Sequence, residues 1–294
     1  MTLVNVGSIN IDRVYAVAHI PAPGETIPAR GLEEGLGGKG ANQSIAAARA
    51  GGQVRHVGAV GPDGGWAAGR LAEEGVDVGH VVTLERPTGH AVIALDERGE
   101  NAIIIHAGAN GAVPAAAVRE GLQGLGSGDR LILQNEINAN EIAAREARRR
   151  GMEIVYSAAP FVAEDAARML PLVDVVVMNE IEAAQLSAHL GTPLEALPVR
   201  AVLMTKGAKG AVWIEAARRI EVPAWPAPRV VDTTGAGDCF TGWLAGALDR
   251  GCTLEAALTE AAAAAALKVS RKGAAAGIPT REEVTAFMRT AKRS

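Results

Sequence analysis

An aspartate directly after a short glycine-rich loop is the first candidate for chemistry in this sequence. In the stretch 230–242, Gly235, Ala236 and Gly237 precede Asp238, and the apolar residues that follow recur at helical spacing. Small residues let the backbone approach a ligand closely. The free N–H groups and the positive end of the helix dipole would form an anion site, most naturally for a phosphate. Asp238 is then a candidate general base, or an acid that only complements the helix dipole.

A second glycine-rich loop, residues 35–43, precedes the expected helix 44–50. No Ser or Thr follows Lys39, which excludes the P-loop of nucleoside triphosphatases. The loop follows short β runs rather than the first strand of a βαβ unit, which disfavours a dinucleotide site. Two readings stay open: the loop presents Lys39 and Asn42 to a small polar group, or it is a tight turn before a helix.

The elements that must position these loops alternate along the second half of the chain. Continuous apolar strands that alternate with helices are typical of a parallel sheet covered on both faces. The sequence therefore predicts an α/β fold, a three-layer α/β/α arrangement around a mostly parallel sheet. Strands are expected at 3–9, 54–61, 78–84, 130–133, 153–156, 173–178, 201–205 and 211–214, and helices at 65–74, 114–122, 139–150, 163–170, 181–190, 240–251 and 254–269.

Short β runs broken by Pro and Gly between residues 14 and 36, and a hairpin signal at 96–100, suggest a separate small sheet. We expect one domain over 1–294, with a small β lid formed by about 11–36 and 88–106. The exposed edges of such a lid suggest a homodimer in which two lids pair.

Ligands of parallel sheets sit beyond the carboxyl ends of the strands, and polar residues follow several of these ends. Glu136, Asn179 and Glu180, and the turn 205–210 would share one edge. Asn179 and Glu180 also fit a helix N-cap with a first-turn acid, and residues 205–210 fit a simple turn before the next strand. Asn10 and Asp12, two residues apart at a strand end, would face one side.

Composition excludes several classes of protein. The chain has 294 residues, 21% of them charged, and a net charge of -4, so no nucleic-acid or membrane partner is expected. No targeting segment or apolar stretch of membrane-spanning length is found, which predicts a cytoplasmic protein.

The two glycine motifs, 37–42 and 232–238, resemble in order and spacing the sugar-side and phosphate-side signatures of the ribokinase-like (PfkB-type) family of sugar kinases. The resemblance extends over essentially the whole chain, and it is strongest to members that act on ribose. It implies ATP-dependent phosphorylation of ribose at its 5-hydroxyl, with ATP, Mg²⁺ and an activating K⁺. It also implies site residues by position.

The resemblance makes Asp238 the general base and the backbone of Gly235, Ala236 and Gly237 the anion hole. The residues that would hold the sugar are Asn10, Asp12, Gly38, Lys39, Gly40, Ala41, Asn42 and Glu136. Those along the nucleotide would be Asn179, Thr205, Lys206, Gly207, Ala208, Lys209, Gly210 and Gly237.

For the monovalent ion the matching positions, which would act mostly through carbonyl oxygens, are Asp232, Thr234, Lys268, Arg271 and Gly273. Two positions depart from the family pattern. Gly277 stands where a side-chain oxygen is expected, which predicts a water there or weaker ion binding. Ala262 stands where close relatives present a polar ring or amide to the base, which predicts apolar contact with adenine.

Other activities stay open at this point. The same chemistry on deoxyribose, another sugar or a nucleoside is the nearest, although aromatic residues are only 3% of the chain and a nucleoside pocket would use one for stacking. A dinucleotide-dependent oxidoreductase and a binding-only or regulatory protein are the alternatives from other classes.

Overall fold

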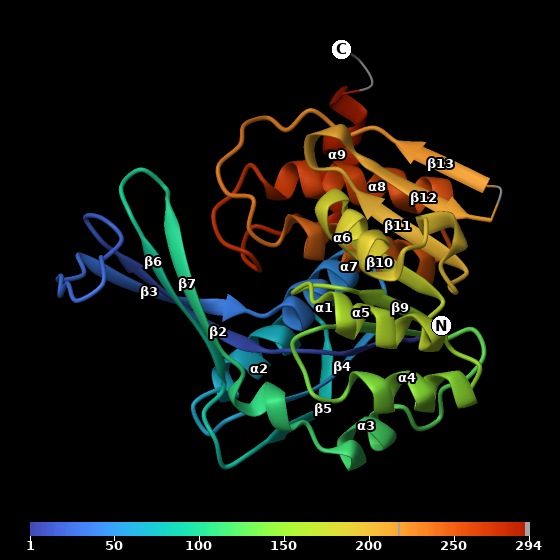
Figure 1. Ribbon diagram of the computed structural model, residues 1–294, viewed down its shortest axis with the longest axis horizontal. Helices are drawn as coiled ribbons and strands as arrows, with labels where there is room; N and C mark the ends of the chain where they lie inside the picture. Colours follow the sequence, from blue (N-terminus) through green and yellow to red (C-terminus); the bar gives the residue numbers. More distant parts are fainter. Residues whose placement is uncertain (217, 292–294) are drawn as a thin grey trace.

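A large, mostly parallel sheet forms the centre of the molecule (Figure 1). The computed structural model describes residues 1–216 and 218–291, and within these the strands form a nine-stranded sheet of order β13-β12-β11-β10-β9-β8-β1-β4-β5. Neighbours from β5 to β11 are parallel, whereas β12 and β13 are antiparallel. The bounds are β1 (Leu3–Val6), β4 (Val54–Val60), β5 (Asp77–Thr83), β8 (Arg130–Gln134), β9 (Glu153–Ser157), β10 (Val175–Asn179), β11 (Ala201–Thr205), β12 (Ala211–Glu215) and β13 (Arg218–Val222).

Helices cover both faces of this sheet, which confirms the predicted three-layer α/β/α arrangement. Alternate residues along each strand enter two different hydrophobic clusters. One cluster contains the buried faces of α1 (Lys39–Arg49), α2 (Gly65–Glu73), α7 (Ala236–Asp249), α8 (Leu254–Lys268) and α9 (Arg281–Ala291). The other contains those of α3 (Ala115–Gly121), α4 (Asn140–Arg149), α5 (Ala163–Met169) and α6 (Glu180–Leu190). No helix in the described ranges is long and apolar enough to cross a membrane.

A four-stranded sheet of order β3-β2-β6-β7 projects from one side of this body (Figure 1). Its strands are β2 (Asn10–Ala16), β3 (Gly31–Gly37), β6 (Gly89–Leu95) and β7 (Asn101–His106). They match the predicted small sheet. The first strand differs from the prediction, because β1 ends at Val6 and Asn10 already begins β2. Asn10 and Asp12 therefore belong to the small sheet rather than to the end of a core strand.

Three further elements differ from the predictions. Helix α1 begins at Lys39 rather than Ser44, because Gly38 supplies the start with a φ of 90° and Gly40 lies against backbone. A Cβ on Gly40 would lie 2.4 Å from the Ser8 nitrogen. Strand β13 was not predicted, because its sequence is rich in charged residues and lacks the apolar run expected of a strand. Helix α9 was not predicted either.

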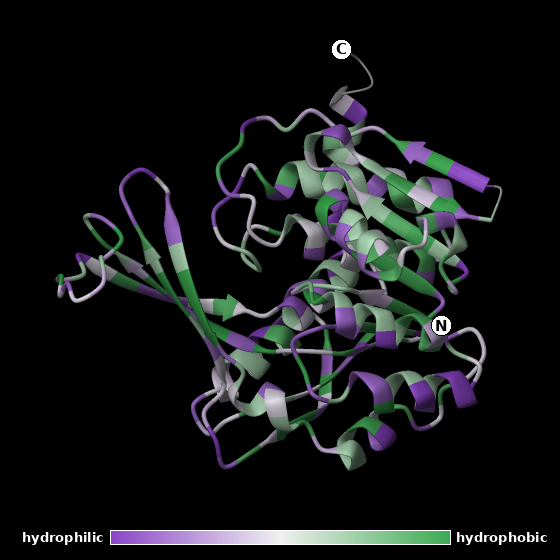
Figure 2. Ribbon diagram, in the orientation of Figure 1, coloured by the Kyte–Doolittle hydropathy of each residue, from purple (hydrophilic) through white to green (hydrophobic). Residues whose placement is uncertain are grey.

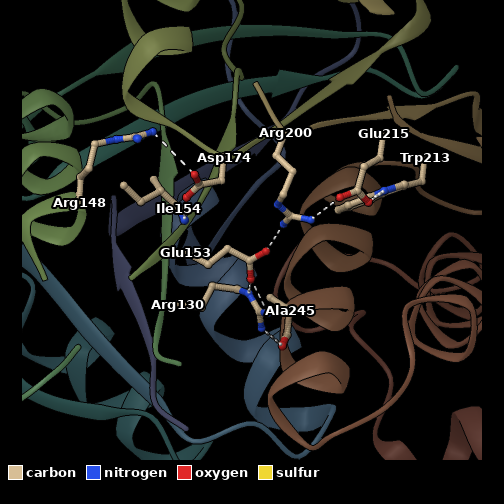
Figure 3. Close-up of polar contacts among 9 residues, drawn as sticks. All are labelled: Arg130, Arg148, Glu153, Ile154, Asp174, Arg200, Trp213, Glu215 and Ala245. Carbon is tan, nitrogen blue, oxygen red and sulfur yellow. Dashed lines mark hydrogen bonds and ion pairs between the residues drawn. The ribbon is translucent and has the colours of Figure 1, made fainter. Parts of the chain in front are cut away.

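Ion pairs join the strands along their amino ends, the edge opposite to the carboxyl ends (Figure 3). Arg130 of β8 contacts Glu153 of β9 at 2.5 Å, and Glu153 also contacts Arg200, which precedes β11. Arg200 reaches Glu215 of β12 at 3.0 Å. These charged side chains pair with one another, so we interpret this edge of the sheet as a part that stabilises the fold.

Helices α1 and α7 lie in backbone contact, because α7 carries glycine where it crosses α1. A Cβ on Gly242 would lie 2.2 Å from the Gln43 carbonyl oxygen, and one on Gly246 would lie 2.3 Å from that of Ala47. Four residues separate the two glycines, so both lie on one face of α7. Side chains at these positions would push the helices apart.

We expect Gly242→Ala to lower the free energy of unfolding by about 1 to 3 kcal/mol, although alanine favours helix, because the added methyl group overpacks the contact. Gly69→Ala is the matched control. Gly69 is mid-helix in α2 with open space around its Cβ position, so the change should stabilise by about 0.5 to 1 kcal/mol. Denaturant unfolding of both variants checks this; equal stabilities would contradict the close contact.

Candidate active site

The loop before α7 has the geometry of an anion site. Gly235 is the N-cap residue, with a left-handed φ of 73°, and α7 begins at Ala236. This conformation favours glycine, and a Cβ there would also lie 3.2 Å from that of Ala274. The predicted loop that opens a helix is confirmed, and Asp238 lies in the first turn of that helix.

Two amide side chains of α1 fix the Asp238 carboxylate. Asn42 donates from Nδ2 to Oδ2 at 3.1 Å, and Gln43 donates from Nε2 to Oδ1 at 3.1 Å. Gln43 in turn accepts from Gln134 Nε2 at 2.8 Å, and the same nitrogen donates to Asn5. Asp238 is 6% exposed. The carboxylate is therefore held by a network that reaches through α1 to strands β8 and β1.

Asp238 borders a recess between the anion loop and the carboxyl ends of β10 and β11. The loop residues Thr233, Gly235, Ala236 and Gly237 line one side. The other residues lining it include Lys39, Ser157, Asn179, Glu182, Thr205 and Thr241. The Asp238 charge is the main cause that raises the pKa of Lys39, against the effect of burial, and Glu136 and Glu182 add to it. The Lys39 side chain thus places a cation at the recess, where the charges of these carboxylates favour it.

The residues expected on the sugar side gather where the small sheet joins the body. Asn10 is buried, and its Oδ1 accepts from Asn110 Nδ2 at 2.7 Å. Asn110 also bonds both backbone groups of Ile9. Gly38 lies against this segment, since a Cβ on it would be 2.9 Å from the Asn10 nitrogen. The segment from β1 into β2 therefore brings Asn10 beside the start of α1.

Glu136 has a structural partner as well as a position at the sheet edge. One carboxylate oxygen, Oε2, accepts from the Lys39 backbone N–H at 2.9 Å and from the Ser8 hydroxyl. The Ser8 oxygen accepts from the Gly40 N–H at 3.1 Å. These contacts satisfy free N–H groups of the first turn of α1 and place a negative charge at its positive end. The carboxylate thereby fixes the glycine loop.

Asp12 lies close to this group. A Cβ on Gly37 would be 2.1 Å from its carboxylate, so glycine is needed there. Burial, and to a smaller extent the charge of Glu136, raise the pKa of Asp12 from 3.8 to about 7. An unpaired buried carboxylate gains from a hydroxyl or N–H donor.

Residues 205–210 form the turn between β11 and antiparallel β12. Thr205 lines the recess, whereas Gly207, Ala208 and Lys209 are exposed, and Lys206 donates its N–H to the Gly210 carbonyl at 2.7 Å. Glycine is required at 210 for packing, since a Cβ would lie 2.0 Å from the Val222 oxygen of β13. The backbone of residues 205–210 therefore forms the simple turn that the sequence analysis gave as an alternative. Of these residues, only Thr205 lines the recess.

Asn179 has both of the roles considered in the sequence analysis: it is a helix N-cap, and it lies at the candidate site. Its Oδ1 accepts from the N–H groups of Ile181 and Glu182, both at 2.9 Å, while Glu182 accepts from the Asn179 N–H at 2.8 Å. This is a capping box. Asn179 also lines the recess, together with Glu182. Glu180 instead points to Lys209, with 3.8 Å between charges.

The expected ion-site residues also come together, but one side chain was not anticipated there. Asp232 accepts from the Thr234 N–H at 2.9 Å and the Gly273 N–H at 2.8 Å. Arg271 turns away to Glu283, at 2.8 Å. However, the buried ammonium of Lys268 lies within this cluster, whereas only its carbonyl was expected there.

Ala262, the other position that departs from the family pattern, is 5% exposed and belongs to the core cluster.

Comparison with known proteins identifies the family. The model for pfkB family carbohydrate kinases matches residues 2–281. This chain belongs to the pfkB family of carbohydrate kinases. The ribokinase of Schizosaccharomyces pombe is 36% identical over 310 residues, covering 97% of this chain and 96% of the relative. The predicted kinase is confirmed, and the oxidoreductase is excluded.

Two other similar proteins bear on the substrate of this pfkB-family kinase. The structure of Arabidopsis thaliana ribokinase complexed with ribose and ATP superposes with a TM-score of 0.85 at 31% identity, covering 98% of each chain. The deoxyribokinase of Salmonella typhi is 28% identical over 303 residues, covering 98% of this chain and 99% of the relative.

The sequence analysis of this pfkB-family chain missed several residues of the site. They are the network members Asn5, Gln43 and Gln134, the supports Ser8 and Asn110, and the recess carboxylate Glu182. Glu182 left a readable signal, since Asn179 followed three residues later by Glu is a capping-box spacing. The network members left none, because their partners lie 91 to 195 residues away.

The raised pKa of Asp12 predicts a pH-dependent stability. Between pH 3.8 and about 7 the unfolded chain ionises Asp12 while the folded protein keeps it protonated. The unfolded state then binds fewer protons, so stability falls as pH rises through this window. The variant Asp12→Asn lacks this titration. We therefore expect its free energy of unfolding to increase relative to that of wild type from pH 4 to pH 7.

Asp77→Asn is the control. A backbone hydrogen bond from Gly79 is the main cause that lowers the pKa of Asp77, so its contribution is lost as pH falls, opposite in sign. Denaturant unfolding across pH measures both. Parallel profiles for wild type and Asp12→Asn would reject the buried carboxylate.

Proposed function

We propose that this kinase transfers the γ-phosphoryl group of ATP to the 5-hydroxyl of ribose, giving ribose 5-phosphate. One observation carries the proposal: the Asp238 carboxylate is held by α1 amides at the mouth of an anion loop, between the sugar-side residues and the recess. The ribokinase relatives, among them the structure complexed with ribose and ATP, support ribose as the sugar.

Asp238 takes the proton of the attacking hydroxyl as general base. Its two amide donors hold the carboxylate in place, and it accepts the proton as the bond to phosphorus forms. The N–H groups of Gly235, Ala236 and Gly237 would stabilise the charge on the transferring group once Ala236 releases the Thr233 carbonyl, to which it donates at 3.2 Å. The cation of Lys39, which lines the recess, adds positive charge there.

The sugar is proposed to lie beside β2 and the start of α1. Asp12 suits a hydroxyl donor, because no group in the described ranges donates to its half-buried carboxylate. Glu136 keeps its second oxygen, Oε1, for a hydroxyl while Oε2 fixes the loop. The full proposed set is Asn10, Asp12, Gly38, Lys39, Gly40, Ala41, Asn42 and Glu136, with Asp238 at the reacting hydroxyl.

ATP is proposed to enter as its magnesium complex, with the phosphates in the recess. Within residues 1–216 and 218–291 no three His, Cys, Asp or Glu gather to form a metal site, which fits Mg²⁺ held through phosphate oxygens and water. Glu182 and Asn179, which line the recess, would offer oxygen atoms to such an ion or to its waters, and the ion would supply positive charge that neutralises the phosphates. The proposed nucleotide residues are Asn179, Thr205, Lys206, Gly207, Ala208, Lys209, Gly210 and Gly237.

Deoxyribose is the second candidate, supported by the deoxyribokinase relative. Both sugars present the same primary hydroxyl, so the catalytic residues would be unchanged. ADP release measured over ribose, deoxyribose, other sugars and nucleosides distinguishes them. If ribose is the substrate, the kcat/KM for ribose must be the highest of this panel.

We expect Asp238→Asn to fold but to lose about 10² to 10⁴ of turnover, because the base is removed. Asn42 Oδ1 is buried without a partner in the described ranges, so a flip of that amide can accept the new N–H. Circular dichroism and ADP-release kinetics measure fold and rate. As an acid that only complements the dipole, Asp238 would leave turnover nearly intact.

Asp249→Asn is the matched control at the other end of α7. Asp249 accepts from the Gln53 N–H at 2.9 Å and lies outside the recess. It should retain wild-type kinetics. If Asp238→Asn keeps more than about a tenth of wild-type turnover, the anion loop rather than the base is the main catalytic device.

The small sheet is proposed to act as a lid and to join two copies of the chain. Lys272, in the turn after α8, contacts Glu33 of β3 at 2.7 Å, which links this sheet to the anion-loop side of the single domain. The edge strand of this small sheet, β7, exposes Ile103, Ile104 and Ile105. The ribbon of the small sheet is coloured as hydrophobic along part of its strands (Figure 2). Exposed apolar edges favour pairing with another chain.

We expect Ile104→Lys to shift the protein from dimer to monomer, because a charge at a residue 71% exposed would be buried by pairing. Val162→Lys, an exposed apolar residue before α5, is the control and should leave the mass unchanged. Sedimentation equilibrium measures both. A monomeric wild type at micromolar concentration would refute the lid-paired dimer.

A further inference from the structure

Lys268, the last residue of α8, has a side chain with no exposed surface. Its Nζ donates to the backbone carbonyl of Asp232 at 2.9 Å and lies 3.9 Å from the Asp232 carboxylate. A buried ammonium is costly unless it is paired and hydrogen-bonded. This one has both a carbonyl acceptor and a carboxylate beside it.

Asp232 is the residue through which this ammonium acts on the anion loop. Its carboxylate accepts from Thr234 at the start of the loop and from Gly273 in the turn after α8. Three residues later, Gly235 takes the left-handed conformation that opens α7. The hydrogen bonds and the Lys268 charge outweigh burial and hold the pKa of Asp232 below its ordinary value.

Gly277 completes the arrangement by leaving room. A Cβ at Gly277 would lie 3.2 Å from Lys268 Cε and 2.6 Å from the Gly273 oxygen. A serine or larger side chain would therefore crowd the lysine stem. Lys268 and Gly277, the one position of the expected ion site that departs from the family pattern, are therefore packed against one another.

These residues do not fit a potassium ion. The Asp232 carbonyl, which would have to be a ligand, already accepts from an ammonium, and an ion bound there would have a positive charge as its neighbour. Gly277 supplies no side-chain oxygen. An ammonium carries the same unit charge and satisfies the same oxygen by donating a hydrogen bond.

We infer that the ammonium of Lys268 is a built-in replacement for the monovalent cation, and that this kinase works without potassium. The inference rests on the proposed function for the role of the anion loop. Lys268 is a positioning residue: it holds Asp232, and Asp232 holds the loop. Potassium should therefore be unnecessary in the wild type and should become useful once the lysine is removed and a side-chain oxygen is restored.

The test compares wild type, Lys268→Ala, Lys268→Met and the double variant Lys268→Ala with Gly277→Ser in potassium chloride and in tetramethylammonium chloride at equal concentration. Wild type should change by less than about twofold in turnover and keep its Tm. Lys268→Ala should lose about tenfold or more in tetramethylammonium. In the double variant, potassium should restore turnover and raise Tm by several degrees, because it binds only the folded state.

Lys272→Met is the matched control, an exposed lysine four residues away, and should show no response to potassium. Lys268→Met keeps the apolar stem and tests the charge alone should the alanine variants not fold. A wild type whose turnover and Tm both rise with potassium would overturn the inference, as would a folded double variant whose Tm ignores the ion. Because Tm needs neither sugar nor nucleotide, this readout stays valid even if ribose is not the substrate.

Discussion

The backbone contact between α1 and α7 is the constraint on which the site depends. Gly242 and Gly246 remove the side chains that would separate the two helices, and the carbonyl oxygens of α1 fill the space. Only at this separation do Asn42 and Gln43, short amide side chains on α1, reach the Asp238 carboxylate at 3.1 Å. The two glycine motifs, about 190 residues apart in sequence, meet because of this crossing. A packing requirement and a catalytic one thus fall on the same pair of helices.

The opposite edges of the sheet use charge in different ways. At the edge opposite to the candidate site, Arg130 of β8 pairs with Glu153 of β9, and Glu153 pairs across β10 with Arg200, which precedes β11, so the three charges form a continuous ionic chain (Figure 3). On the side of the candidate site, Asp12 of the small sheet has a raised pKa, and the charges of Asp238, Glu136 and Glu182 raise the pKa of Lys39 at the start of α1. Burying unpaired charge costs stability, and such groups concentrate where a ligand can pair with them. The fold therefore places its stabilising ion pairs on one edge and its reactive groups on the other.

The parts of the site that could be predicted from sequence are local or follow from topology. Gly235 to Asp238 reads as a loop opening a helix because the signal lies within a few residues, and Asn179 and Thr205 share an edge because parallel strands end together. Gln43 and Gln134 could not be found, since each looks like an ordinary residue of its element and matters only through tertiary contacts. The start of α1 was misplaced because glycine is a weak helix former, and only contact with Ser8 explains Gly40.

Lys268 illustrates how far a resemblance carries. The family pattern assigns this position a carbonyl oxygen, a group every residue has, so sequence comparison cannot tell whether its side chain takes part. The structure decides by sterics: α8 ends with the lysine stem directed between Asp232 and Gly277, and the missing side chain at 277 is the room that the stem needs. The side-chain oxygen that Gly277 lacks is thus accompanied by the charge that the Lys268 side chain adds. In the proposed account, the positive charge that supports the anion loop through Asp232 is the Lys268 ammonium.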